Sequence, residues 1–74
     1  MTERQKASAH LSKGMKVAVY TVDLHGEHAT ITCINQAGNV VVEYDRVIKG
    51  CEYDDDPQDY SGQILHPRQV ELIT

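Results

Sequence analysis

The sequence predicts an all-β fold, a small five-stranded barrel within one domain of 74 residues. In short runs rich in Val, Ile and Thr, apolar residues recur at every second position, which is the period of a strand with one buried face. Gly, Asn, Asp and Pro separate these runs, as is typical of turns. A chain of this length makes one domain with a small core, and a content of 41% hydrophobic residues suits such a core.

The beginning of the chain differs from the rest because it shows no clear apolar periodicity. We expect residues 1–13 to form a flexible basic arm in front of a domain that spans residues 14–74. The first strand is expected in MKVAVYT, residues 15–21, where Val17 and Val19 share one face.

The second and third strands are expected to form a hairpin. HATITCIN (28–35) and VVVEYD (40–45) both alternate, and the third run continues toward Ile48. The segment QAGN between them predicts a tight turn around Gly38. DLHGE (23–27), which precedes the hairpin, is expected to be a loop.

The last third of the chain contains a long loop and two short strands. The acidic loop CEYDDDPQDYSG (51–62) precedes a fourth strand in GQILH (62–66). Pro67 suits the start of a 3₁₀ turn over residues 67–69, and VELIT forms the fifth strand. The inward faces of the five strands give the predicted core, which comprises Val17, Val19, Ile31, Cys33, Val40, Val42, Ile64, Val70 and Leu72.

The order of these elements resembles that of small SH3-like barrels of the Tudor type. The similarity lies in the opening GMKVAVY, the hairpin ITCINQAGNVVVEY, the long loop before the fourth strand and the ending HPRQVELI. It covers residues 14–73. The resemblance implies a barrel whose loops recognise cationic side chains with aromatic walls and nearby carboxylates.

Charge is unevenly distributed along the chain, whose net charge is −4. Residues 1–16 carry four basic groups and one acidic group, a balance of +3, whereas residues 17–74 carry three basic and ten acidic groups, a balance of −7. An acidic body repels a phosphate backbone, which argues against broad nucleic-acid binding. The charged N-terminal stretch lacks the apolar centre of a secretory signal, and we expect a cytoplasmic protein with no membrane association.

The acidic loop combines carboxylates with aromatic rings, which are scarce because the chain has four tyrosines and neither Phe nor Trp. Ring faces attract cations, and neighbouring carboxylates reinforce that attraction. The predicted partner-binding residues are Tyr20, Tyr53, Asp54, Asp55, Asp56, Asp59 and Tyr60.

Metal-dependent and catalytic functions are not favoured by the motifs. A calcium loop starting at Asp54 would need Gly at its sixth position and Glu at its twelfth, and the chain has Asp59 and Leu65 there. His25 and His28 form one H-x-x-H pair, but Cys33 and Cys51 lie 18 positions apart and supply no second pair of zinc ligands. No motif joins a nucleophile to a base. We therefore expect no cofactor and no enzymatic activity.

Several apolar residues fall on the predicted outward faces of the strands. Alternation places Ala18, Tyr20 and Val41 outward, together with Ile73. Curvature of a small barrel would cover them, and so would a homodimer interface. The sequence leaves both alternatives open.

The predicted function is that of a non-enzymatic protein-interaction module, acting as an adaptor, an inhibitor or a subunit. Its acidic loop would meet a basic protein or peptide surface. The alternative is a nucleic-acid-associated regulator whose basic groups touch phosphate. That alternative requires clustering, on one face, of Arg4, Lys6, Lys13, Lys16, Arg46, Lys49 and Arg68.

Overall fold

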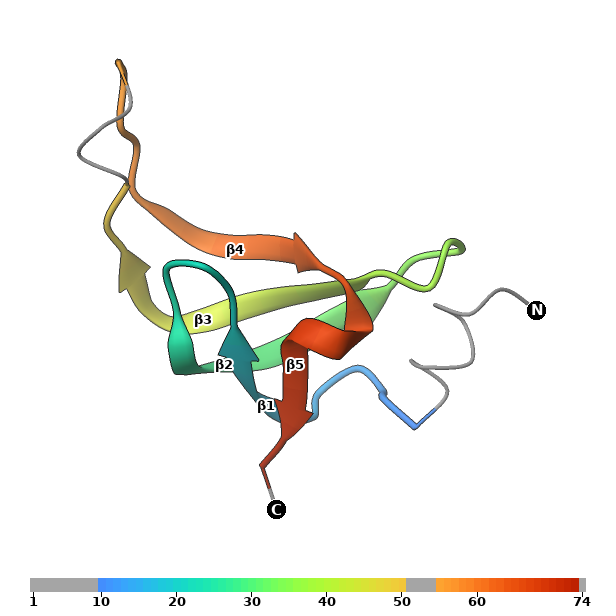
Figure 1. The fold of residues 1–74 in the computed structure, drawn as a ribbon. Helices are drawn as coiled ribbons and strands as arrows, with labels where there is room; N and C mark the ends of the chain where they lie inside the picture. The colour runs from blue at the N-terminus through green and yellow to red at the C-terminus, as the bar shows by residue number, and fades with distance from the viewer. Residues whose placement is uncertain (1–9, 51–54, 74) are drawn as a thin grey trace.

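Five antiparallel strands form one curved sheet in the computed structural model, which describes residues 10–50 and 55–73 (Figure 1). The all-β prediction is confirmed, because the only helix among these residues is a single 3₁₀ turn. The elements in chain order are β1 (Lys16–Tyr20), β2 (His25–Ile34), β3 (Val40–Ile48), β4 (Tyr60–Leu65), the 3₁₀ helix η1 (Pro67–Gln69) and β5 (Val70–Leu72).

The sheet is open, so the prediction of a barrel is wrong in this respect. The strand order is β4-β3-β2-β1-β5, which leaves β4 and β5 as the two edges. The helix η1 carries the chain from one edge to the other. His66 caps its N-terminal end: its N–H donates to Gln69 Oε1 at 2.9 Å, and its Nδ1 accepts from the Arg68 N–H at 3.1 Å. The chain leaves this cap to pair β5 with β1 rather than with β4.

The inner face of the curved sheet holds the core. Alternation predicted its centre correctly, because the largest fully buried side chains are Val17, Val19, Ile31, Val40 and Val42. Two further predicted residues of β5 are partly buried and pack against this cluster, namely Val70 and Leu72.

Cys33 was predicted in the core and is exposed. A β-bulge explains the error. Ile31 pairs with Val42, but Cys33 already pairs with Val41, so the register shifts by one residue between them. Thr32, in the bulge, donates its hydroxyl to the Val41 carbonyl at 3.2 Å. The extra residue turns Cys33 to the outer face of the sheet.

Ile64 was also predicted in the core, and its side chain is 63% exposed. The phase of β4 is opposite to the prediction because Leu65, not Ile64, pairs with the buried Val40. The inward position two residues earlier belongs to Gln63, whose Oε1 accepts a hydrogen bond from the Tyr44 hydroxyl at 2.6 Å. A polar residue therefore occupies a position on the inner face, which alternation of apolar residues does not reveal.

The β2–β3 hairpin follows the prediction at its turn and differs at its start. The Gly38 N–H donates to the Asn35 carbonyl at 3.0 Å, and Asn35 Oδ1 accepts from the Asn39 N–H at 2.9 Å. Gly38 has a φ of 87°, a conformation that residues with a Cβ rarely adopt. The predicted loop 23–27 is shorter, because β2 begins at His25.

The four apolar residues predicted on outward faces differ in how far they are exposed. Ala18, between its cross-strand neighbours His28 and Glu71, is buried. Val41 is partly buried, whereas Tyr20 and Ile73 are exposed. Curvature of the sheet therefore accounts for only part of this apolar surface.

Leu11, which we assigned to the flexible arm, is part of the core and only 5% exposed. The segment after it is attached to β2, because the Gly14 N–H donates to the Ile31 carbonyl at 2.7 Å and the Ile31 N–H donates to the Met15 carbonyl at 2.9 Å. The folded unit thus begins before Gly14. Residues 1–9 lie outside the described part of the chain.

We predict that Leu11→Ala lowers the free energy of unfolding by about 2–3 kcal/mol, through lost burial and the cavity it leaves. Chemical denaturation measures this change. The matched control is Val22→Ala, because Val22 is 93% exposed. If both variants unfold at the denaturant concentration of the unmodified protein, Leu11 does not belong to the core in solution.

Candidate functional site

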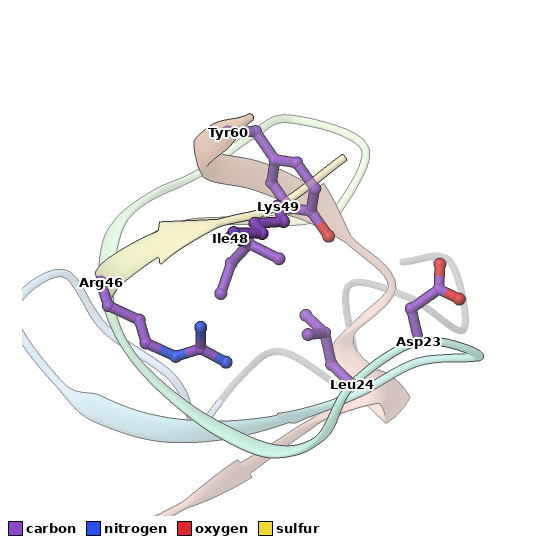
Figure 2. Close-up of a pocket in the computed structure, with 6 residues that line it drawn as sticks. All are labelled: Asp23, Leu24, Arg46, Ile48, Lys49 and Tyr60. Carbon is purple, nitrogen blue, oxygen red and sulfur yellow. The ribbon is translucent and has the colours of Figure 1, made fainter. Parts of the chain in front are cut away.

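A pocket lies at the end of the sheet where the β1–β2 turn approaches the end of β3 and the start of β4. Its volume is about 320 Å³. Figure 2 shows Arg46 on one side of this pocket and Asp23 on the other, with Leu24 and Ile48 between them. The full set of lining residues is Asp23, Leu24, Arg46, Ile48, Lys49 and Tyr60.

The β1–β2 turn is held by the side chain of Thr21. The Thr21 hydroxyl accepts from the N–H groups of Asp23 at 3.2 Å and Leu24 at 3.1 Å. The Thr21 N–H in turn donates to the Leu24 carbonyl at 2.8 Å. This local turn directs Leu24 into the core and leaves Asp23 exposed at the pocket.

The floor and one wall of the pocket are apolar and aromatic. Leu24 and Ile48 are both buried members of the core. Tyr60 packs its ring edge-to-face against Tyr44, with centroids 5.9 Å apart and an angle of 70° between the rings. Tyr44 is fixed in turn by its hydrogen bond to Gln63. Tyr60 is therefore held by the core and is not a freely moving loop residue.

Both phenols remain neutral at neutral pH. Burial raises the pKa of Tyr44 to about 12, and the neighbouring Tyr60 and Glu27 add to this effect. Burial also raises the pKa of Tyr60, with contributions from Asp23 and Glu27.

The Arg46 charge is compensated within the site. Arg46 Nη2 lies 2.5 Å from Oε1 of Glu27, whose side chain is 18% exposed. That oxygen is buried and has no hydrogen bond of good geometry, so the contact is best described as a close ion pair. Among residues 10–50 and 55–73, neither Asp23 nor Lys49 forms an ion pair. Within the described part of the chain, the pocket thus has one carboxylate and one ammonium group that are not in an ion pair.

Tyr20, predicted to act with Tyr60, does not line this pocket. It packs instead beside Gly26, where an added Cβ would lie 3.6 Å from the Tyr20 hydroxyl. A smaller hollow of about 180 Å³ includes Gly26, Glu27 and Arg46, again without Tyr20. The predicted grouping of Tyr20 with Tyr60 is not found.

Residues 55–59, the described part of the acidic loop before β4, project away from the sheet (Figure 1). Two predicted binding residues, Tyr53 and Asp54, lie outside the described part of the chain. Asp55 and Asp56 are exposed, and Asp56 Oδ2 accepts from Gln58 Nε2 at 3.5 Å. The projecting carboxylates remain accessible to another molecule.

The two ends of this loop meet closely at Gly50. The Gly50 N–H donates to Asp59 Oδ1 at 3.2 Å, and this hydrogen bond connects the two ends of the loop. A Cβ added at Gly50 would lie 2.6 Å from the carbonyl oxygen of Gln58, a distance that real Cβ atoms essentially never show. Glycine is required here because the backbone segments cross so closely. The contacts of Gly50 with Gln58 and Asp59 therefore hold the two ends of the loop together.

Of the seven basic residues in the alternative phosphate-binding prediction, the first four do not form a common surface within the described part of the chain. Arg4 and Lys6 lie outside it, and Lys13 is exposed before β1. Lys16 pairs with Asp45, with the Nζ and Oδ1 atoms 2.5 Å apart. The charge of Lys16 is therefore compensated locally.

The remaining three residues of this set lie near opposite ends of β3. Arg46 and Lys49 line the pocket. Arg68 is in η1, which follows β4 where that strand pairs with Val40, at the opposite end of β3 from Ile48. The described basic groups are dispersed and do not share one face.

Residues 10–50 and 55–73 contain no cluster of three or more His, Cys, Asp or Glu side chains suited to a metal ion. The same residues contain no helix with the length and hydropathy of a transmembrane span. Comparisons with protein-family models, curated proteins and solved structures find no match to this chain.

Proposed function

We propose that the chain is a non-enzymatic protein-interaction module that binds a basic side chain of a protein partner in the pocket. The observation that carries the proposal is the position of Asp23 and Tyr60 above an apolar floor. The acidic loop would contact the basic surface around that side chain. Such a module acts as an adaptor, an inhibitor or a subunit of a larger assembly.

A Lys or Arg side chain fits the chemistry of this pocket. Its aliphatic stem would lie on Leu24 and Ile48, as long basic side chains do on apolar surfaces. Its charged end would then be near the Asp23 carboxylate and the Tyr60 ring, which attract it together. Attraction of the cation does not require a second aromatic ring beside Tyr60, because the Asp23 carboxylate supplies a full negative charge.

Two cations in the pocket wall limit how strongly another cation binds. Arg46 is compensated by Glu27, and its effect is small. Lys49 has no such carboxylate among the described residues and opposes an incoming cation. The pocket is therefore selective for a partner with further positive groups that the acidic loop can contact. Electrostatic attraction by the loop would act mainly on the association rate and on selectivity.

Nucleic-acid binding receives less support from the same arrangement. The described basic residues are dispersed, and two of them are already paired with Asp45 and Glu27. A partner that presents Lys or Arg is the better complement to the accessible carboxylates.

Binding to a short lysine-rich peptide tests the proposal, with a glutamine-rich peptide of equal length as the negative probe. We predict that Asp23→Asn weakens binding of the lysine-rich peptide and that Lys49→Gln strengthens it, each by a factor of about three to ten. Titration calorimetry measures the dissociation constant of the lysine-rich peptide for each variant. The matched control is Glu71→Gln, which removes the same charge from an exposed position on β5.

Equal effects of Asp23→Asn and Glu71→Gln would place binding outside the pocket. Weaker binding by Lys49→Gln would contradict the proposed position of the cation. A preference for the glutamine-rich peptide would exclude a cationic ligand altogether.

A further inference from the structure

β4 is an edge strand that carries neither a charge nor a proline to prevent pairing with another strand. It consists of YSGQIL, six residues without a charge or a proline, and among the described residues only β3 pairs with it. The opposite edge, β5, has three residues and contains Glu71. Proteins commonly protect an edge by shortness, charge, proline or a bulge. β4 has neither a charge nor a proline, and its one irregularity in register lies near its start, between Tyr60 and Gly62.

An apolar row on the outer face of the sheet ends at this edge. Cys33 pairs with Val41, and Val41 pairs with Ile64, so the three side chains are cross-strand neighbours. Cys33 and Ile64 are exposed, and Val41 is partly buried. A strand added beside β4 would cover Ile64 and continue this row.

The charges that flank β4 specify what can pair with it. Asp59 precedes the strand, and Arg68 follows it in η1. Antiparallel pairing of β4 with β4 of a second copy would place the acidic end of each strand beside the basic end of the other. Parallel pairing would place like charges together. The strand itself is uncharged, so no like charges would oppose one another within the pair.

We propose that β4 is a dimerisation edge, at which two copies of this chain pair antiparallel about a two-fold axis. The interface would be self-complementary, with the same strand contributed by each copy. Backbone hydrogen bonds would hold the two sheets together, and Ile64 would lose its exposure to water. Tyr60, the first residue of β4, also lines the pocket, but the other lining residues lie outside β4 and the dimer does not require a ligand in the pocket.

The test is the oligomeric state over a concentration series from micromolar to millimolar, measured by sedimentation. The unmodified protein is expected to form a dimer, and Ile64→Lys is expected to raise the dissociation constant at least about tenfold. The matched control, Val22→Lys, adds the same charge at a 93% exposed apolar position in the β1–β2 turn and should leave the constant unchanged. Melting temperatures establish that both variants are folded.

Hydrogen exchange of the unmodified protein gives a second readout that does not depend on a variant. Amide protection of residues 61–65 should increase with protein concentration, while that of β5 should not. A monomer at millimolar concentration would overturn the proposal. A dimer that Ile64→Lys leaves intact, or whose protection increases along β5 and not along β4, would overturn it as well.

Discussion

Replacing Ile31 by Ala is expected to lower the free energy of unfolding by about 2–5 kcal/mol, through lost burial and the cavity that remains. Ile31 is among the largest fully buried side chains and pairs with the buried Val42. Both of its backbone groups also bond to the segment before β1, at Gly14 and Met15. A cavity here would therefore weaken the packing of β2 against β3 and against the segment before β1. A small domain has little stability to lose.

At a protein concentration where the chain is monomeric, Ile64→Ala is the matched control, because it removes the same atoms from a strand position that is 63% exposed. Surface changes of this kind usually alter stability by less than about 0.5 kcal/mol. Denaturant titrations followed by circular dichroism measure both variants. Equal stabilities for the two would show that the inner face described here is not the core, and that the phase of β4 is wrong.

The contrast between these two isoleucines shows how far the sequence determines the fold. Alternation identified Ile31 correctly because the first part of β2 has an uninterrupted two-residue period. It failed at Cys33 because a single bulge reverses the phase, and at Ile64 because Gln63 occupies the inward position. Local periodicity cannot report a bulge or a polar pair that depends on a neighbouring strand. For the same reason, it did not reveal that η1 leaves the sheet open.

The site was predicted only in part. The sequence pointed to Tyr60 through the acidic loop, but the residues opposite it were missed. Asp23 and Leu24 come from a turn that is distant in the sequence, and pairing of β1 with β2 and β2 with β3 brings that turn to the end of the sheet. The Thr-x-Asp pattern at Thr21 was the available signal, because a Thr hydroxyl commonly binds the backbone two or three residues later.

Replacing residues 51–57 by a short glycine-containing turn is expected to reduce binding of the lysine-rich peptide by about tenfold or more, while the protein stays folded. The fold should tolerate the change because Gly50 and Gln58 already lie in contact at the base of the loop. Shortening a loop also slightly lowers the entropic cost of closing it, which favours the folded state. The melting temperature should therefore change by only a few degrees, whereas the peptide loses the carboxylates that attract it.

Salt dependence distinguishes the contribution of the loop from that of the pocket. Between about 0.1 M and about 1 M salt, the Debye length falls from about 10 Å to about 3 Å, so attraction by the projecting loop should be screened strongly. The unmodified protein should lose affinity steeply over this range, and the shortened variant much less. A variant in which Asp55 and Asp56 are both changed to Asn keeps the loop length and should fall between the two. If the shortened variant retains both the affinity and the salt dependence of the unmodified protein, the loop is ordinary surface. Asp23→Asn then decides separately whether the pocket binds the cation without it.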